Sequence, residues 1–570
     1  MCLTCGCDAE PSKVERIKEA SSALRGTIAE DLANDSPTFD GANAQLLKFH
    51  GVYQQEDRDK RKEARKRGLD RHYQMMVRTR IPGGRVSPDG YLAHDRIADA
   101  WGNGTIRITT RQDFQLHGVL KGDLWSSLHA INEALMTSLG GCGDQVRNVM
   151  CCPAPIDDRL RADLQAALPR LVDGLTPTTK AYHQIWVDGE EVTDGAPEPD
   201  ELYGTRYLPR KFKVGLAVEG DNCIDVYSND LGLVAMRGDG GGLDGFTVLV
   251  GGGLGRTNNK PDTYPAVGRP LAFVATEHLV ETARAVVAVQ RDYGNRSDRR
   301  HARLKYLLAE RGLPWFREQV QSRVPFELAP PRTLRWEPLD DHLGWHEQGD
   351  GRLFYGLFVE NGRVQDDGES RLKTALRRLV EEHGPVLWMT AQQNLLISGV
   401  EPAGRTAVER LLTGHGVSLT EHVSQTVRNS MACPAVPTCG LAVAESERVL
   451  PALSRRIEGI VADLGLAEER ISFRMTGCPN GCARPYLGDV GFVGTTLGKY
   501  DVFLGGDFLG TRLNSLFAHN VPIDEIPALL RGPLDAFAAE RRPGEGFGDW
   551  CSRMGVGALR DRFQAEAATA

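Results

Sequence analysis

The chain has 570 residues, of which 41% are hydrophobic and 25% charged, and its formal net charge is -8. This length exceeds one typical hydrophobic core, so several domains with room for a large cofactor are expected. The negative charge argues against non-specific nucleic-acid binding, although local basic clusters could still bind small anions. Without a membrane-length apolar run or a secretory signal, the sequence predicts a cytoplasmic protein whose twelve cysteines are reduced thiols, metal ligands or core residues.

Helices and strands are expected to alternate along the chain. Residues 1–74 are polar and strongly charged, and the run at 54–72 predicts a solvated helix, with partner contact as the alternative. Apolar or alternating runs predict strands at 105–112, 245–253, 385–390 and 499–506, and helical spacing predicts a helix at 450–465. This mixture indicates an α+β fold.

The chain repeats itself at an offset of 281 residues. VRNVMCCPA at 146–154 recurs as VRNSMACPA at 427–435, and TTRQDFQLHGV at 109–119 recurs as TAQQNLLISGV at 390–400. A repeat of this length predicts a duplicated, domain-sized module whose halves pack about a pseudo-twofold axis, with a cofactor site at the centre.

Two cysteine pairs stand close together in the second repeat. Cys433 and Cys439 form a C-x5-C pair, and Cys478 and Cys482 form a C-x3-C pair, with a predicted helix and strand between them. Four converging thiolates suit zinc or an iron–sulfur cluster, and the wide C-x5-C spacing favours the cluster over structural zinc. Buried cysteines without a ligand remain the third interpretation.

The segments SMACPAVPTCGLAVAESER (430–448) and MTGCPNGCARPYLGDVGFVG (475–494) closely resemble the paired motifs of sulfite and nitrite reductases that couple siroheme to a 4Fe-4S cluster. The resemblance implies that Cys433, Cys439, Cys478 and Cys482 ligate the cluster and that the Cys482 sulfur also bridges to the siroheme iron. It implies an α+β fold of duplicated, pseudo-twofold sulfite/nitrite reductase modules around a central cofactor site.

The resemblance also divides the chain into five parts. The expected order is a charged extension (1–74), a ferredoxin-like half-domain (75–140), a siroheme and substrate α+β domain (141–344), a second ferredoxin-like half-domain (345–418) and a 4Fe-4S and siroheme α+β domain (419–570).

Basic residues on predicted strands provide anion-binding groups. In TIRITTRQ the alternation puts Ile106 and Ile108 on one face and Arg107, Thr109 and Arg111 on the other. Taken alone, such a face is more often a solvated strand surface.

The resemblance assigns roles to individual residues of this kind. It implies that Arg78, Arg147, Lys211 and Lys213 surround the substrate. It implies that siroheme is lined by Arg107, Arg111, Gln115, His117, Gln393, Asn394 and Asn480, and that the segment 295–306 binds carboxylates. For His117 a hydrogen-bonded core role is favoured over an axial ligand or a general base.

The implied reaction is the six-electron reduction of sulfite to sulfide. Nitrite is the alternative substrate, and the presence of Lys213 beside Lys211 favours sulfite, because a dianion requires more positive charge. The segment 248–256 fails the G-x-G-x-x-G pattern at Arg256, so electrons must come from a separate protein.

Ferredoxin is the favoured donor and an NADPH-oxidising flavoprotein the alternative. Neither a membrane nor a specific nucleic acid is expected as a partner. A rival from another class is a non-enzymatic zinc or nucleic-acid-binding protein.

Five further cysteines depart from the family pattern. Cys2, Cys5 and Cys7 open the chain, and Cys151 and Cys152 are adjacent. The first group could bind a metal or form a redox switch, but a flexible terminus is the favoured interpretation. The adjacent pair could have a covalent or redox role, but small buried thiols are favoured.

Overall fold

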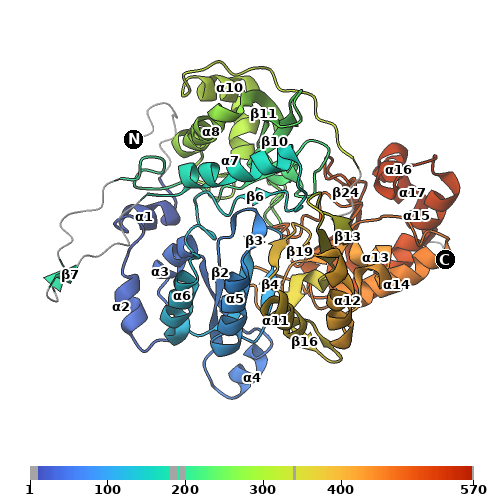
Figure 1. Ribbon diagram of the computed structural model, residues 1–570, viewed down its shortest axis with the longest axis horizontal. Coiled ribbons are helices and arrows are strands. Elements are labelled where there is room, and N and C mark those ends of the chain that lie inside the picture. The colour runs from blue at the N-terminus through green and yellow to red at the C-terminus, as the bar shows by residue number, and fades with distance from the viewer. Residues whose placement is uncertain (1–9, 179–185, 188–189, 192–198, 338–341, 568–570) are drawn as a thin grey trace.

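The computed structural model describes residues 10–178, 186–187, 190–191, 199–337 and 342–567 (Figure 1). Cys2, Cys5 and Cys7 therefore lie outside the described residues. Helices and strands alternate along the chain, as the α+β prediction requires. Within these ranges no helix combines the length and apolar character needed to cross a membrane.

Two five-stranded sheets have strands drawn from both repeats. Sheet I has the order β1-β2-β5-β4-β15, and sheet II has the order β13-β14-β19-β18-β3. The strands of sheet I are β1 (Val52–Glu56), β2 (Tyr73–Arg78), β5 (Phe114–Val119), β4 (Ile106–Ile108) and β15 (Arg363–Val364). The strands of sheet II are β13 (Gly344–Glu347), β14 (Leu353–Leu357), β19 (Leu395–Val400), β18 (Val386–Met389) and β3 (Arg85–Val86).

The two sheets exchange one short strand each. β3 comes from the first repeat but pairs with β18, whereas β15 comes from the second repeat but pairs with β4. One continuous core, which includes Val77 and Ile108 of sheet I and Tyr355 and Ile397 of sheet II, joins them. The exchange is reciprocal, as expected for two modules related by a twofold axis.

Helices cover these sheets and begin at recognisable signals. Ser87 caps α5 (Pro88–Ala100) by accepting a hydrogen bond from the backbone nitrogen of Gly90, and Pro88 occupies the first turn. The related helices are α6 (Leu124–Glu133), α11 (Leu372–His383) and α12 (Arg405–Gly414). Figure 1 shows α5 and α6 beside α11 and α12 in the lower part of the molecule.

The other two sheets also share one topology. Sheet III has the order β6-β9-β10-β11-β12 and sheet IV the order β20-β21-β22-β23-β24, with three parallel strands followed by two antiparallel ones in each. The strands of sheet III are β6 (Met150–Cys151), β9 (Val214–Val218), β10 (Leu231–Arg237), β11 (Leu243–Val250) and β12 (Arg269–Ala275). Those of sheet IV are β20 (Ser430–Ala432), β21 (Phe473–Thr476), β22 (Val490–Thr496), β23 (Lys499–Leu504) and β24 (Ser515–Pro522). The predicted duplication is thus confirmed.

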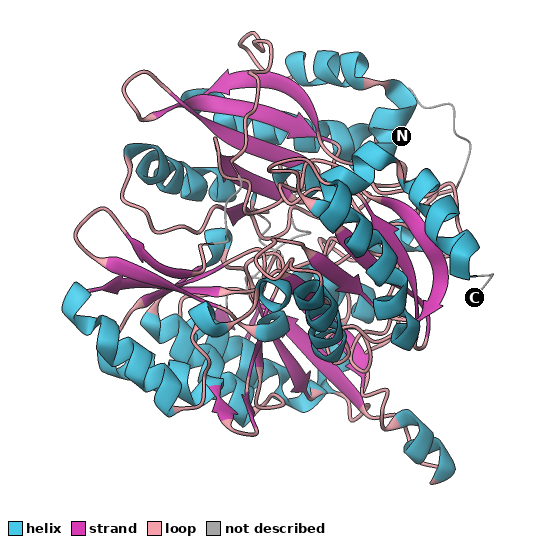
Figure 2. Cartoon of the chain, turned by 90° about the vertical axis from the view of Figure 1, so that its right-hand side faces the viewer, coloured by secondary structure: helices cyan, strands magenta, loops and turns pink. Residues whose placement is uncertain are grey.

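Each of these sheets has its own core and its own helices. Those packed with sheet III are α7 (Arg159–Leu175), α8 (Leu279–Tyr293), α9 (Leu304–Arg311) and α10 (Leu313–Gln321); those with sheet IV are α14 (Leu450–Asp463), α15 (Ile526–Glu540), α16 (Phe547–Met554) and α17 (Val556–Ala567). Figure 2 shows the helices around the sheets and the loops gathered between the sheets in the middle of the molecule.

Short elements complete the described chain. They are α1 (Lys13–Glu19), α2 (Ile28–Ala33), α3 (Asn43–Leu46), α4 (Arg61–Lys66), α13 (Gln425–Arg428), β7 (Trp186–Val187), β8 (Glu190–Glu191), β16 (Asp366–Asp367) and β17 (Ser370–Arg371).

The predicted strands and the predicted helix at 450–465 are observed as β4, β11, β18, β23 and α14. β4 ends at Ile108, however, so Thr109 and Arg111 lie on the turn before β5 and do not share a strand face with Arg107 as predicted. The helix predicted at 54–72 is wrong for most of that run. Residues 52–56 form β1, which pairs along its whole length with β2, and only α4 is helical. Backbone pairing at the edge of sheet I decides the conformation there, and charge alone carries no periodicity that could distinguish strand from helix.

Candidate functional site

Parallel strands bring the four cysteines together. β20 and β21 are adjacent and parallel, with Ala432 paired to Met475, so the loops that follow them leave the same edge of sheet IV. Cys433 follows β20 directly, and Cys478 follows β21 by two residues. The backbone nitrogen of Gly477 donates to Cys433 Sγ at 3.5 Å, which ties the two loops at this edge.

The electrostatics confirm that the four thiols are neighbours. Burial raises the pKa of Cys433 well above its usual value, with further contributions from Cys482, Cys478 and Cys439. Burial raises the pKa of Cys478 to about 12, again with Cys482 as the next cause. Thiolates that repel one another need a shared cation, so this donor set fits a metal cluster.

A buried ion-pair network braces the first cysteine loop. Arg107 pairs with Glu447 and donates to the Ala432 carbonyl at 2.8 Å, next to Cys433. Arg363 of the exchanged strand β15 donates to the two Glu447 oxygens at 2.7 and 3.0 Å. The sequence indicated neither Arg363 nor Glu447, because their pairing depends on the exchange.

A row of polar side chains crosses four strands of sheet I. The strand register places Arg363 opposite Arg107, Arg107 opposite Gln115, and Gln115 opposite Arg78. Gln115, with its amide oxygen turned toward Arg78, accepts hydrogen bonds from that guanidinium.

Sheet II has a different row at the corresponding positions. Its register pairs Arg85 with Trp388, Trp388 with Leu396, and Leu396 with Gly356. Only sheet I therefore carries the charged row, and the two halves have diverged in chemistry.

The residues expected around the substrate lie in the electrostatic field of Cys482. Cys482 lies close enough to Arg78, Lys211 and Lys213 to act on the pKa of each, and its contribution favours their charged forms. Arg147 joins them through its backbone nitrogen, which donates at 3.0 Å to the carbonyl of Phe212, between the two lysines. The segments that carry the four basic residues therefore lie close together, and three of the side chains lie near Cys482.

Both lysines are half-buried without a counter-ion. Burial lowers the pKa of Lys211, helped by Arg210, and burial lowers the pKa of Lys213 far more, helped by Arg111 and Lys211. In the part of the chain that the structure describes, neither ammonium group pairs with a carboxylate. Unneutralised cations of this kind constitute an anion site.

Arg111 is largely occupied by the protein itself. Its two terminal nitrogens donate to Asn229 Oδ1 at 3.1 Å and to the carbonyls of Asn148 and Val214 at 2.5 and 3.1 Å. Its Nε atom has no acceptor among the described residues.

His117 does not have the hydrogen-bonded core role that was favoured for it. The ring is buried, and neither nitrogen has a hydrogen-bond partner within the described chain. Burial lowers its pKa well below the usual value, and Arg363, Arg107 and Arg78 lower it further, so the ring is neutral. A buried imidazole with both nitrogens unused fits a wall that faces a polar cofactor.

Of the second-repeat residues expected at the cofactor, Asn480 lies on a cysteine loop, whereas Gln393 and Asn394 lie on the turn between β18 and β19. Gln393 donates to the Ala432 carbonyl at 3.0 Å, and its Oε1 has no donor among the described residues. Asn394 Oδ1 accepts from the Val359 nitrogen at 3.0 Å, and Asn480 donates to Cys478 Sγ at 3.4 Å.

The segment 295–306 is engaged by protein carboxylates. Arg299 donates to both oxygens of Asp144 at 2.7 and 2.8 Å, and Arg303 to both oxygens of Asp230 at 2.9 and 2.7 Å. The glycine-rich loop around 251–256 packs on the cysteine loop instead of ending in a helix, since the Arg256 nitrogen donates to the Pro479 carbonyl at 3.0 Å.

Family comparisons agree with this geometry. Residues 171–328 and 424–569 match the nitrite and sulphite reductase 4Fe-4S domain, and residues 67–134 and 346–415 match the nitrite/sulfite reductase ferredoxin-like half domain. The chain therefore belongs to the nitrite and sulfite reductase family, a class of oxidoreductases.

Individual relatives cover nearly the whole chain. The sulfite reductase (NADPH) hemoprotein beta-component of Paenibacillus sp. is 45% identical over 96% of each chain. The sulfite reductase (ferredoxin) of Synechococcus elongatus is 44% identical over 98% of this chain and 92% of its own. The solved structure of the Mycobacterium tuberculosis NirA protein shares the fold, with a TM-score of 0.77, 24% identity and coverage of 96% of this chain and 98% of its own.

Proposed function

We propose that this protein is a sulfite reductase that reduces sulfite to sulfide with six electrons, using siroheme and a 4Fe-4S cluster. The observation that carries the proposal is that the loops after the parallel strands β20 and β21 leave one edge of sheet IV and carry the four cysteines, with Arg78, Lys211 and Lys213 close to Cys482. Relatives named sulfite reductases, 44–45% identical over nearly the whole chain, support it.

In this proposal Cys433, Cys439, Cys478 and Cys482 would hold the cluster, and the exposed Cys482 would lie on the side toward siroheme. When bound, the two cofactors would supply the electrons for the reduction. His117 and Gln393 Oε1, which have no hydrogen-bond partner among the described residues, would offer polar groups to the tetrapyrrole, and Gln115 would orient Arg78.

The basic residues bind the substrate and move protons. Arg78 and Arg147 keep their charge and orient the sulfite oxygens, because a guanidinium hardly loses its proton. Lys211 and Lys213 have lowered pKa values, so each releases a proton to a departing oxygen more readily than an exposed lysine. Burial raises the pKa of Asp113 to about 6, and Asp113 Oδ1 lies 3.6 Å from Arg78 Nε. In this proposal Asp113 replaces the protons that the site delivers to the substrate.

The proposal is tested on the holoenzyme with reduced methyl viologen as an artificial donor. We expect sulfite consumption with a matching amount of sulfide, and visible tetrapyrrole bands that shift when sulfite is added. A colourless protein, or one that reduces nitrite but not sulfite, would overturn the assignment.

The electron donor is inferred from the surface beside the cluster. Arg58 donates to the carbonyls of Cys439 and Ala442 at 3.2 and 2.6 Å, so the segment that contains α4 is anchored on the cluster loop. Residues 57–71 hold eight lysines and arginines against four acidic residues, and most of them are exposed. We propose that this surface receives a small acidic donor, which favours ferredoxin over a flavoprotein subunit.

Charge reversal tests this docking site. The double variant Arg65→Glu, Lys66→Glu should raise KM for reduced ferredoxin by about tenfold at low ionic strength while methyl viologen activity stays constant. The double variant Arg405→Glu, Arg410→Glu, on α12, provides the control. Equal KM values for both double variants would exclude the α4 surface.

A further inference from the structure

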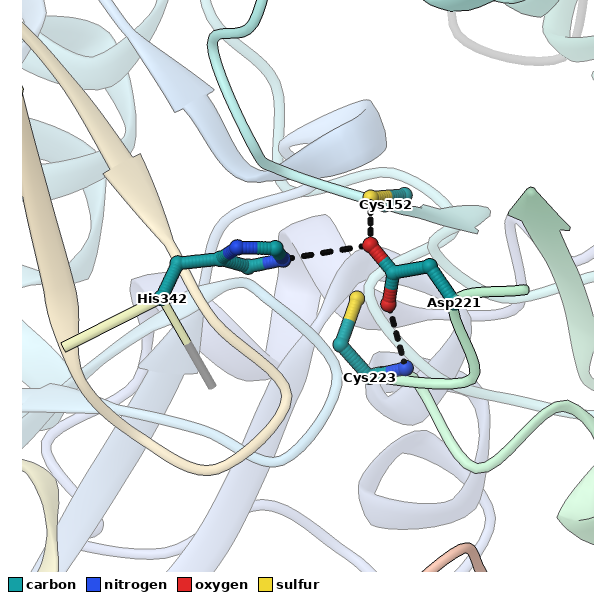
Figure 3. Close-up of side chains that lie close together, drawn as sticks. All are labelled: Cys152, Asp221, Cys223 and His342. Carbon is teal, nitrogen blue, oxygen red and sulfur yellow. Dashed lines mark hydrogen bonds and ion pairs between the residues drawn. The ribbon is translucent and has the colours of Figure 1, made fainter. Parts of the chain in front are cut away.

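Four metal-ligating side chains meet at a second place in the molecule. Cys152, Asp221, Cys223 and His342 each turn one donor atom toward a common point, and all four donor atoms lie within 4.8 Å of one another (Figure 3). The exposed fractions are 2%, 1%, 8% and 7%, respectively. None of these residues belongs to the cofactor and substrate site described above.

The place corresponds to the iron–sulfur site under the pseudo-twofold relation. Cys152 stands at the position of Cys433 in the repeat offset by 281 residues. In sheet III, β6 and β9 are adjacent and parallel like β20 and β21, so the loops after them also leave one edge.

The strand register extends the correspondence to Cys223. Met150 pairs with Gly215 and Gly215 with Gly232 in sheet III, as Met431 pairs with Arg474 and Arg474 with Gly491 in sheet IV. Both β9 and β10 are therefore offset by 259 residues from β21 and β22, with no gap between them. The loop between β9 and β10 then aligns Cys223 with Cys482 and Asp221 with Asn480.

The first repeat thus keeps two of the four cluster thiols and adds two new donors. Two thiols cannot hold a cubane cluster, which takes four cysteine ligands. Two thiolates, one imidazole and one carboxylate form a four-ligand set suited to tetrahedral Zn²⁺. We propose that Cys152, Asp221, Cys223 and His342 bind one zinc ion.

The spacing of the donor atoms suits this ion. Cys152 Sγ lies 3.1 Å and His342 Nε2 lies 3.2 Å from Asp221 Oδ2, and the two thiols are hydrogen-bonded to each other. Ligand atoms around tetrahedral zinc are separated by roughly 3.3 to 3.8 Å, given bond lengths of about 2.0 to 2.3 Å. Shifts of up to about an ångström would admit the ion, while the two thiol protons and the proton that His342 Nε2 shares with Asp221 leave to solvent.

The surroundings support the ligands and offer a route to them. Arg161 of α7 lies 3.3 Å from Asp221 Oδ2 and offsets part of the negative charge that two thiolates and a carboxylate leave on a divalent ion. Cys223 also lines a cavity together with Asn222, Gln392 and Arg474, through which an ion can enter.

The zinc would connect the two repeats. Cys152, Asp221 and Cys223 belong to loops of sheet III, whereas His342 lies two residues before the start of β13 of sheet II. In addition, Gln392 of the second repeat donates to the Cys223 carbonyl at 3.2 Å. The ion therefore fastens the start of the second repeat to the first.

The first experiment measures metal content of the full-length holoenzyme, purified without chelators and without a nickel column. We expect inductively coupled plasma mass spectrometry to find one zinc per chain. X-ray absorption at the zinc edge should show two sulfur ligands and two nitrogen or oxygen ligands. Absence of zinc after growth in zinc-supplemented medium, or a Cys152–Cys223 disulfide in the intact protein, would overturn the proposal.

Variants then assign the ligands. Cys223→Ser and His342→Gln should each lower zinc content by about tenfold or more, whereas Cys551→Ser, which changes a buried cysteine of α16, should keep it. Iron content reports whether the variants are folded and loaded with cofactors. Unchanged zinc content in both ligand variants would contradict the site. If either variant misfolds, the zinc-edge spectrum of the wild-type protein provides the test, and a ligand set other than two sulfur and two nitrogen or oxygen atoms would contradict the site.

Discussion

At the scale of single residues, the proposed function depends most on the position of Cys482. It is the exposed member of the four clustered cysteines, and its backbone carbonyl accepts a hydrogen bond from Thr110 Oγ1 at 2.9 Å. That contact holds the residue between the cluster loop and the first-repeat turn that carries Arg111.

Replacement of this sulfur should separate the two cofactors. We predict that Cys482→Ser lowers sulfite reduction by about 100-fold or more, because electrons lose their path to the substrate. Sulfide formation with methyl viologen measures the loss. Cys551→Ser is the control, and retained sulfite reduction in Cys482→Ser would refute the role of this sulfur.

Lys213 should set the preference between anions. We predict that Lys213→Asn lowers kcat/KM for sulfite more than for nitrite, because the dianion depends more on positive charge than the monoanion. Steady-state kinetics with both substrates provide the comparison. Equal losses would show that Lys213 does not discriminate.

The same lysine should reduce stability. Its pKa is lower in the folded protein than in the unfolded chain, so below the ordinary lysine pKa the unfolded chain binds more protons. This destabilisation is present at neutral pH and disappears as the pH rises toward about 10.

Lys213→Met should therefore raise Tm at pH 7 by about 2 °C in buffer without sulfite or phosphate, and the gain should shrink toward pH 10. Lys62→Met, at an exposed position of α4, serves as the control. A lower Tm for Lys213→Met at pH 7 would contradict the argument.

At the scale of elements, the cluster loops depend on Glu447. This carboxylate holds Arg107 of β4 and Arg363 of β15, and its backbone nitrogen donates to the Cys433 carbonyl at 3.2 Å. Removing the charge would leave the buried Arg107 guanidinium without its counter-ion, a change that typically costs about 3 to 5 kcal/mol.

We predict that Glu447→Gln lowers Tm by several degrees and speeds the loss of iron on dilution. Glu445→Gln, which removes the exposed ion pair with Arg448 two residues away, should change neither by a comparable amount. Thermal unfolding and a chelator assay for released iron measure the two effects, and identical behaviour of both variants would show that the brace is unimportant.

The sequence predicted some elements and missed others for identifiable reasons. The apolar spacing of Leu453, Ile457 and Val461 predicted α14, and these side chains are buried in the core of sheet IV. β3 and β15 have two residues each, too few for any periodicity, and they pair with strands of the other repeat. Arg363 and Glu447 were missed because only that long-range pairing brings them together.

In the candidate site, too, the sequence predicted some features and missed others. The resemblance implies that Cys433, Cys439, Cys478 and Cys482 are cluster ligands, and the loops that carry them follow adjacent parallel strands, β20 and β21. The state of His117 was not predictable from its neighbours in the chain, since it results from burial near Arg78, Arg107 and Arg363.

At the scale of the whole molecule, the halves should not fold separately. Sheets I and II share a core, and each lacks an edge strand without the other repeat. We predict that residues 1–337 and 342–570, expressed separately, aggregate, but that co-expression recovers a soluble complex of the two. Affinity purification through one fragment measures recovery, and a monomeric, folded single fragment would contradict the prediction.

The strand exchange also sets a schedule for biosynthesis. As the chain leaves the ribosome, sheet I must wait for residues 363 and 364, and the guanidinium row must wait for Glu447 to neutralise Arg107. The last cysteine loop, which ends at Cys482, is translated later still, so the proposed cluster can acquire all four ligands only after most of the chain has been made. A product interrupted before Cys482 would therefore contain no complete redox centre able to pass electrons to oxygen.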